Sequence, residues 1–349
     1  PNMLYTLYNK LLAQYRYICI IVVQVFQTRC VTMSNISTKP QIGVSACLAS
    51  QAVRYDGSFI TNQFIKNECS AFFDIHTVCP EVEAGMGVPR QVIQLRDFDG
   101  ETKLVYSKNP ETEITGFMRD FSDKRIKRLP ALDGYIFKKD SPSCGVYKVP
   151  VKNDKSGMRK RNGVGIFAQA FKDQFPLVPT EDEGRLHDKG IRENFLERIY
   201  AHYRWRQIQA SENPLKAFRD YHKNYKLILM AKDNGASKHL GRLVAKVNRD
   251  NFSEISEQYI SLFMQAMSKI PSQGHHVNVM MHILGYLKDH LNKKDKAELL
   301  EWFEIYREKR VARITPMMLL QHHFNRHEND YIADQYYFSP FPGKLMLPE

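Results

Sequence analysis

Cysteine is scarce in this chain, and no two cysteines form a close CxxC pair. Six cysteines among 349 residues are too few and too scattered for a secreted disulfide scaffold, so a reducing cytoplasm fits them better. The lack of CxxC pairs also disfavours a structural zinc site, which needs four ligands and usually takes them from such pairs. A glycine-rich nucleotide-binding loop is missing too, because the GMGVPR segment lacks the lysine and the following helix of such loops.

Long apolar runs are absent as well. The run at residues 17–26 is about half as long as a membrane-spanning helix requires, so we expect no membrane partner. Lys10 and Arg16 precede this run as in a signal peptide, but no small-residue cleavage site follows it. Met33 begins a polar segment, and we expect it to be the true start, with residues 1–32 as an upstream or non-native extension.

Acidic residues are outnumbered by basic ones. The chain has 38 Asp and Glu against 50 Lys and Arg, a formal net charge of +12, which favours a polyanionic partner. Residues 185–335 alone contain 25 basic and 18 acidic residues. Several of these bases lie beside aromatic residues, as around Trp205 and Tyr221. Such mixtures suit RNA backbones and exposed bases. They also suit ordinary helices whose aromatics face the core while the charges face water, which is the commoner case.

Two kinds of pattern divide the chain into two expected domains. Residues 40–175 hold short apolar strands, punctuated by glycine and proline and separated by helical stretches. This alternation predicts an α/β domain with a parallel, Rossmann-like sheet. An acidic, proline-containing linker is expected at residues 176–188. From 189 to 340, successive amphipathic patterns predict an all-α helical bundle.

The segment at residues 151–165 is basic and contains glycine, and a predicted helix follows it. One interpretation is a solvated connection. The other is a phosphate-contacting loop at the start of that helix, where backbone amides and the helix dipole favour anions. The sequence leaves both open.

Three cysteines lie in short segments of small, turn-forming or charged residues: Cys47 in SACLASQAVRYDG, Cys79 in CPEVEAGMGVPR and Cys144 in SPSCG. Each follows or ends a predicted strand, and the carboxyl ends of parallel strands converge on one crevice. Three thiolates on a 4Fe-4S cluster would leave one iron without a protein ligand, able to act as a Lewis acid. Their number therefore favours a catalytic cluster. Cys69, on a predicted helix, is expected to be a buried thiol.

These motifs occur in order with RYDG at residues 54–57 and GVPR at residues 87–90, and together they resemble the thiouracil desulfurase family. The resemblance covers residues 41 to about 170. Residues 188–340 look like the YbgA-type domain that is fused to this family in some bacteria. The fused arrangement is similar to a desulfidase that removes sulfur from 4-thiouridine in tRNA.

The resemblance implies a 4Fe-4S cluster on Cys47, Cys79 and Cys144, and a hydrolysis without redox change. Water would replace the thiocarbonyl sulfur, so thiouracil becomes uracil. The expected partner is tRNA, held by the basic helical domain while the base is extruded from its stack. Free 2- or 4-thiouracil is the alternative substrate. A noncatalytic, metal-stabilised RNA-binding protein is the alternative from another class.

Hydrolysis needs a group that deprotonates water within reach of the open iron. The resemblance places Ser141 beside the cluster, although its hydroxyl could instead cap the turn at Pro142. It also implies a carboxylate on the approach to Cys79. Asp74, before that cysteine, is preferred as this carboxylate. Glu81, two residues after the cysteine, competes with it and would otherwise brace the loop by accepting backbone amide hydrogen bonds.

Overall fold

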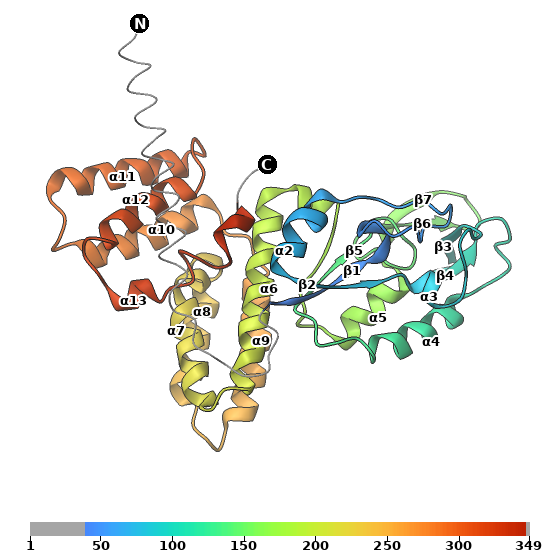
Figure 1. The fold of residues 1–349 in the computed structure, drawn as a ribbon, viewed down its shortest axis with the longest axis horizontal. Coiled ribbons are helices and arrows are strands. Elements are labelled where there is room, and N and C mark those ends of the chain that lie inside the picture. Colours follow the sequence, from blue (N-terminus) through green and yellow to red (C-terminus); the bar gives the residue numbers. More distant parts are fainter. Residues whose placement is uncertain (1–38, 347–349) are drawn as a thin grey trace, which may run out of the picture. The chain divides into compact units, whose positions relative to one another are not determined.

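The computed structural model describes residues 39–346 (Figure 1). The expected extension at residues 1–32 and the apolar run at 17–26 lie outside the described residues. An N-terminal α/β part is followed by a C-terminal part made of helices, as the sequence predicts. No helix among residues 39–346 combines the length and the apolar character that crossing a bilayer requires.

A parallel sheet forms the centre of the α/β part. Its strands are β1 (Gln41–Ser45), β2 (Asp74–Val78), β5 (Gly134–Phe137) and β8 (Thr180–Asp182), in the order β2-β1-β5-β8. Since all four strands run in one direction, the segments after β1, β2 and β5 all begin at the carboxyl end of the sheet. The strand β8 lies in the expected linker at residues 176–188, so the α/β part continues to at least Asp182.

A second, mixed sheet is present that the sequence analysis did not predict. Its strands are β3 (Ile93–Phe98), β4 (Glu101–Tyr106), β6 (Val149–Asn153) and β7 (Arg159–Gly163), in the order β4-β3-β6-β7. The pairs β3–β4 and β6–β7 are antiparallel hairpins, whereas β3 and β6 run parallel. The expectation of a loop at residues 151–165 is therefore wrong. The strand β7 escaped prediction because its segment RKRN contains no apolar residue that could alternate with polar ones. All four of these side chains are exposed.

Short helical segments and two longer helices complete the α/β part. They are η1 (Ala46–Leu48), η2 (Phe64–Cys69), α2 (Ser70–Phe72), α3 (Pro80–Glu83), α4 (Thr115–Ile126) and α5 (Ile166–Gln174). The helix α5 packs on the sheet through Phe171, whose ring centroid lies 4.9 Å from that of Tyr135. Cys69 is fully buried in an apolar cluster, which confirms the expectation for this thiol.

The helical part has its own aromatic core. Its elements are η3 (Arg185–His187), α6 (Lys189–Gln209), α7 (Pro214–Lys232), α8 (Asn234–Lys246), α9 (Phe252–Met267), α10 (Gln273–Leu284), η4 (Gly285–Leu287), α11 (Lys293–Arg307), α12 (Ile314–Phe324), α13 (Asp330–Ala333) and η5 (Gly343–Met346). Trp205 and Tyr221 are buried and contact each other and Tyr259. The aromatics that the sequence placed among basic residues thus face the core and cannot stack on an RNA base.

The helix α6 shares its core with the parallel sheet. Phe195 and Ile199 belong to the same apolar cluster as Ile42 in β1. A side chain at Gly134 in β5 would lie 2.7 Å from Ile199, so glycine is required for this close approach. Asp133, which is fully buried, accepts a hydrogen bond from the backbone of β1 and lies 3.1 Å from His202 of α6. Burial of these groups makes α6 a structural component of the α/β part.

A buried polar cluster links the helices of the C-terminal part. Lys232 of α7 forms an ion pair of 2.8 Å with Glu197 of α6, and both side chains are almost fully buried. Arg313 pairs with Glu197 at 3.5 Å and contacts the Nε2 atom of His276, whose Nδ1 atom lies 2.9 Å from the Tyr337 hydroxyl. Burial, assisted by the charge of Arg313, lowers the pKa of His276 from its usual 6.5 to about 2.

We expect this histidine to make the protein less stable as the pH falls below 6.5. The unfolded chain protonates His276 near pH 6.5, whereas the folded chain holds it neutral until about pH 2, so the unfolded state binds more protons over that interval and the free energy of unfolding falls. Urea unfolding followed by circular dichroism should show a smaller loss of stability on acidification for His276→Gln than for the wild type. Equal losses in the two proteins would contradict the assignment.

Candidate metal-cluster site

The three loop cysteines lie on segments that begin at the carboxyl end of the parallel sheet. Cys47 is in η1 after β1, Cys79 directly follows β2, and Cys144 is in the loop after β5. All three are free thiols. They lie near one another, since Cys79 raises the pKa of Cys47 and both raise the pKa of Cys144 by like-charge repulsion. The topology therefore brings the three sulfur atoms into one neighbourhood.

Burial dominates the electrostatics of these thiols. It raises the pKa of Cys47 to about 11 and that of Cys144, which is 6% exposed, well above its usual value. The charges of Lys138 and Arg54 oppose this rise at Cys47. Without a metal the thiols are protonated at neutral pH, so loading iron would release protons. Buried thiols beside cationic side chains form a donor set suited to an anionic iron-sulfur group.

Cys79 is held at the start of the short helix α3. The backbone amides of Glu81 and Val82 bond to its thiol, and its Sγ atom lies 3.7 Å from the carbonyl oxygen of Val53. The backbone N–H of Cys79 donates to the Glu83 carboxylate at 3.0 Å. The contacts of the Sγ atom fix the direction of the thiol, and the contact with Val53 joins the β2 segment to the segment that follows Cys47.

The loop that carries Cys144 is a tight turn organised by Ser141. The Oγ atom of Ser141 accepts hydrogen bonds from the backbone N–H groups of Ser143 (3.3 Å) and Cys144 (3.1 Å). A Cβ atom at Gly165 would lie 2.5 Å from the Ser143 carbonyl, so this glycine lets α5 begin against the turn. The turn-capping interpretation of Ser141 is thus observed. Because its oxygen only accepts in these bonds, its own O–H remains able to donate.

Glu81 connects two of the three cysteine segments. Its carboxylate accepts a hydrogen bond from Arg90 Nε at 2.7 Å and another from Ser143 Oγ at 2.9 Å, and its side chain is 12% exposed. Arg90 also donates to the Val53 carbonyl at 2.9 Å. Glu81 therefore braces the site through side chains, not through the backbone amides that the sequence suggested. It also lies close enough to Cys144 to raise the pKa of that thiol.

Asp74 lies at the amino end of β2, whereas the sequence analysis preferred it as the carboxylate beside Cys79, which follows the carboxyl end of that strand. It is the first residue of β2 and pairs with Gln41, whereas Cys79 follows the last residue of the same strand. Five residues of extended strand separate them by roughly 16 Å at ~3.3 Å per residue. The structure does not bring Asp74 to the cysteines, because β2 begins at this residue. Glu81 is the carboxylate that the fold places beside them.

Sequence reasoning missed several groups around the cysteines. Ser143 is fully buried and donates to Glu81, and Ser45 bonds to the Cys144 thiol. Tyr55 and Phe59, in the segment whose Ile60 amide donates to the Cys47 carbonyl, are 42% and 53% exposed. An exposed aromatic pair near RYDG was the available signal for this surface.

The distances between possible ligand atoms differ between a site for one metal ion and a site for an iron-sulfur cluster. Among residues 39–346, no three His, Cys, Asp or Glu side chains are close enough together to hold one metal ion. Cysteines on an iron-sulfur cluster bind different irons, so their sulfur atoms are farther apart than the ligands of one zinc.

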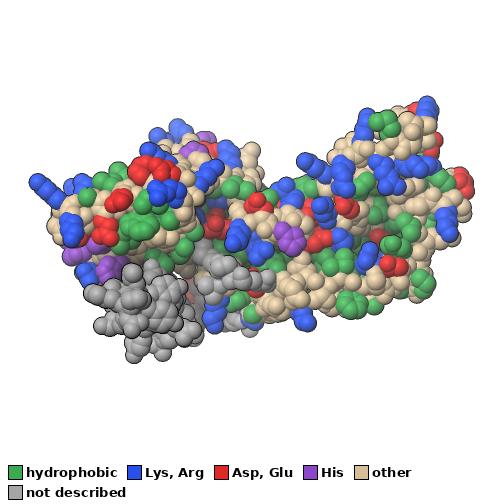
Figure 2. All heavy atoms as spheres, turned by 90° about the horizontal axis from the view of Figure 1, so that it is seen from above, with side chains coloured by type: hydrophobic (Ala, Val, Ile, Leu, Met, Phe, Trp, Pro, Cys, Tyr) green, Lys and Arg blue, Asp and Glu red, His purple; other side chains and the backbone are tan. Residues whose placement is uncertain are grey.

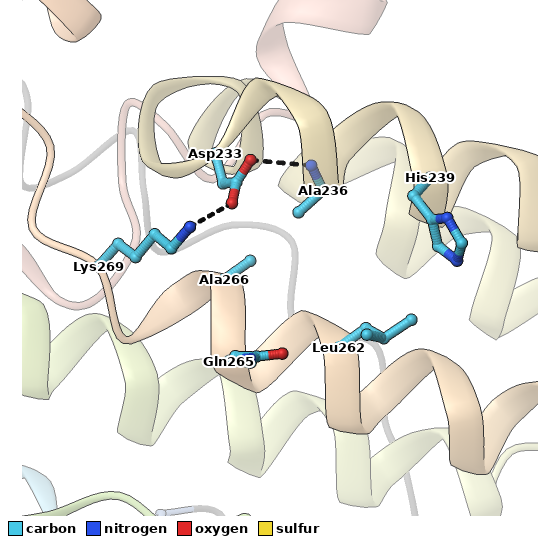
Figure 3. A pocket seen from close by; sticks show the side chains of 7 residues that line it. All are labelled: Asp233, Ala236, His239, Leu262, Gln265, Ala266 and Lys269. Carbon is cyan, nitrogen blue, oxygen red and sulfur yellow. Dashed lines mark hydrogen bonds and ion pairs between the residues drawn. The ribbon is translucent and has the colours of Figure 1, made fainter.

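Two hollows of the described part of the protein differ in how near they lie to the cysteine segments. One, of about 460 Å³, adjoins the end of the Cys79 segment and is lined in part by Met86, Pro89 and Arg90. The other, of about 180 Å³, lies between α8 and α9, where Asp233 bonds to the Ala236 amide and to Lys269 (Figure 3). Only the first lies next to a residue that contacts Glu81.

Family models match both parts of the chain. Residues 42–183 match the model of the family 2-thiouracil desulfurase, and residues 226–342 match the model described as "Protein of unknown function (DUF1722)". One part of the chain is thus similar to the thiouracil desulfurase family and the other to a YbgA-type domain, in the order that the sequence indicated.

Similar proteins exist for each part. "Uncharacterized protein YbgA" of Escherichia coli (strain K12) is 26% identical over 153 residues, which are 44% of this chain and 90% of that protein. A solved structure, "[4Fe-4S]-dependent thiouracil desulfidase TudS", is 24% identical. The superposition covers 43% of this chain and 95% of that one, with a TM-score of 0.34.

Proposed function

We propose that this chain, in which a 2-thiouracil desulfurase domain precedes a DUF1722 domain, is an iron-sulfur-dependent desulfidase that acts on 4-thiouridine in tRNA. The observation that carries the proposal is the convergence of Cys47, Cys79 and Cys144, with Glu81 beside them. The reaction is a hydrolysis. Water adds its oxygen to the thiocarbonyl carbon, the carbon–sulfur bond breaks, and hydrogen sulfide leaves, with no change in oxidation state.

The three thiolates would hold a 4Fe-4S cluster. When bound, such a group supplies an iron without a protein ligand, which attracts the soft thiocarbonyl sulfur and makes the neighbouring carbon more electrophilic. Lys138 and Arg54 are the cations whose charge acts on Cys47, and Arg90 acts on Cys79. These side chains would balance the negative charge of the thiolates and of the departing sulfide.

Glu81 is the proposed proton acceptor for the attacking water. Each of its oxygens receives one hydrogen bond, from Ser143 or from Arg90, and keeps a lone pair for a further donor. Ser141 is proposed to orient the water or to donate to the departing sulfur, because its O–H is not used in the turn that it caps. Ser143 and Arg90 hold the carboxylate in place and act as positioning residues.

The choice of tRNA as substrate is supported by charge and by the exposed aromatics. A net charge of +12 favours a polyanion, and Tyr55 and Phe59, in the segment that hydrogen-bonds to the Cys47 carbonyl, offer exposed ring surface on which an extruded base can stack. The buried aromatics of the helical part give no such support, so that part would hold tRNA through its basic residues alone. Free 2- or 4-thiouracil is the alternative substrate.

The proposal is tested by offering both substrates to protein reconstituted anaerobically with iron and sulfide. We expect 4-thiouridine in bulk tRNA to be lost, as measured by its absorbance, with a kcat/KM at least about tenfold above that for free 4-thiouracil, because phosphate contacts add binding energy. This advantage should shrink as salt is added. Turnover of free thiouracil with intact tRNA 4-thiouridine would instead assign the enzyme to the free base.

A further inference from the structure

The hairpin formed by β6 and β7 carries a concentration of basic residues that the proposed chemistry does not use. Residues 152–161 contain five basic residues and one acidic residue. Residues 154–162 are exposed without interruption. In the right-hand part of Figure 2, which is the α/β part, Lys and Arg side chains gather on the visible face. The hairpin is thus an accessible cationic element of the domain that holds the cysteines.

The hairpin has a defined backbone. Its turn is held by Asn153, whose Oδ1 atom accepts from the backbone N–H and the hydroxyl of Ser156, both at 2.8 Å. Gly157 completes the turn with a φ of +68°, a conformation that favours glycine. The strands pair with Lys152 opposite Arg159, and their register is regular from there to Arg161. The basic side chains are therefore presented from fixed backbone positions.

One face of the hairpin continues into the cysteine site. Residues that pair directly across two strands share a face, and so do residues two apart along a strand. By this rule Lys152, Arg159 and Arg161 lie on the same face. Arg161 forms an ion pair of 2.7 Å with Asp140, the residue directly before Ser141 in the Cys144 loop. A polyanion lying along this face would reach the turn that carries Cys144.

Most of these charges have no anionic partner. Lys155 pairs with Asp99 and Arg161 with Asp140, but within the part of the chain that the structure describes no carboxylate forms an ion pair with Lys152, Arg159 or Lys160. The strand β7 is at the edge of its sheet, where exposed lysines also prevent pairing with other sheets. Preventing such pairing requires charge on β7, but it does not require that this charge lie on the face that continues into the Cys144 loop.

We propose that the β6–β7 hairpin binds the phosphodiester backbone of the RNA strand that flanks the thiolated nucleotide. The inference rests on the proposed function and extends it, since it assigns an RNA contact to the α/β part as well as to the helical part. Lys152 and Arg159 supply the phosphate contacts, and Arg161 ties the hairpin to the Cys144 loop. The hairpin then positions the strand so that one base enters beside the cysteines.

The test compares two double variants that remove the same charge. Lys152→Gln/Arg159→Gln alters the hairpin, and Lys127→Gln/Arg128→Gln alters exposed residues between α4 and β5, at the amino end of the parallel sheet. Fluorescence anisotropy would measure binding of fluorescein-labelled oligouridylate to the full-length reconstituted protein at several salt concentrations. We expect the hairpin variant to bind about tenfold more weakly, with a log–log salt slope reduced by about 1.4, because each single-strand phosphate contact contributes about 0.7.

The remaining outcomes separate this inference from the proposed function. The control variant should bind like the wild type, and Arg159→Lys, which keeps the charge, should lose little affinity. Wild-type protein that binds the oligouridylate while both double variants behave alike would overturn the hairpin assignment only. Wild-type protein that binds neither oligouridylate nor tRNA would overturn the tRNA proposal and the inference together. Matching thermal unfolding midpoints would exclude unfolding as the cause of weakened binding.

Discussion

Replacing Cys144 with alanine is expected to remove both the iron and the activity. The thiol is almost fully buried and lies near the two other cysteines, both of which raise its pKa, so its loss would remove one of the three ligands of the cluster. Loss of the group that polarises the thiocarbonyl raises the barrier by several kcal/mol, which lowers kcat/KM by about 10³-fold or more. Iron analysis, the brown colour of the reconstituted protein and 4-thiouracil turnover are the measurements. Cys47→Ala and Cys79→Ala should behave alike.

Cys69 provides the matched control for this prediction. It is also a buried free thiol, but it lies in the apolar cluster around Ile42 and Phe64, and it is not among the cysteines that raise the pKa of Cys144. Cys69→Ala should lose about 1 kcal/mol of stability through the small cavity that it leaves, and it should keep its iron and its turnover. Cys144→Ala protein with full iron content and normal turnover would contradict the cluster assignment.

Replacing Glu81 with glutamine is expected to lower kcat by about 10² to 10⁴-fold while the iron remains bound, because the amide cannot accept the proton of the attacking water. Glutamine keeps the shape needed to contact Arg90 and Ser143. The measurements are kcat per bound cluster and its dependence on pH. A residue that only braces the loop would change iron content or thermal stability and leave kcat per cluster unaltered.

Two other carboxylates serve as controls for Glu81. Glu83 lies two residues after Glu81 on α3 and bonds to the Cys79 amide and to Arg125, yet no contact joins it to the Cys144 loop among the described residues. Asp74 is at the opposite end of β2. Glu83→Gln and Asp74→Asn should both turn over within about threefold of the wild type, since neither lies where a proton is transferred. A loss in Asp74→Asn equal to that in Glu81→Gln would reverse our assignment.

The sequence predicted the parallel sheet and the helical part because their signals are local. Apolar runs such as IGVS before Cys47 and YIF before the SPSCG loop are strong strand patterns, and each of the three cysteines follows one of them. The fold class and the convergence of these segments follow from the rule that parallel strands deliver their loops to one edge. The second sheet escaped prediction, since RKRN in β7 has the composition of a solvated loop.

The carboxylate preferred from the sequence, Asp74, lies away from the cysteines for a reason of geometry. Asp74 and Glu81 lie five residues before and two residues after Cys79, and sequence distance does not say where a strand begins. The strand starts at Asp74, so this residue lies at the amino end of the sheet, away from the end that carries the cysteines. The bond between Ser143 and Glu81 joins segments 62 residues apart, and the aromatics around Trp205 turned out to be core. Neither outcome can be read from local pattern.

We propose above that the cysteine site hydrolyses a carbon–sulfur bond without electron transfer. The most direct measurement is turnover of 4-thiouracil by anaerobically reconstituted protein in ¹⁸O-labelled water, with no reductant present. Because hydrolysis adds one oxygen from water, we expect uracil that carries one labelled oxygen, together with an equal amount of sulfide. Uracil without the label, or turnover that begins only when an electron donor is added, would contradict it.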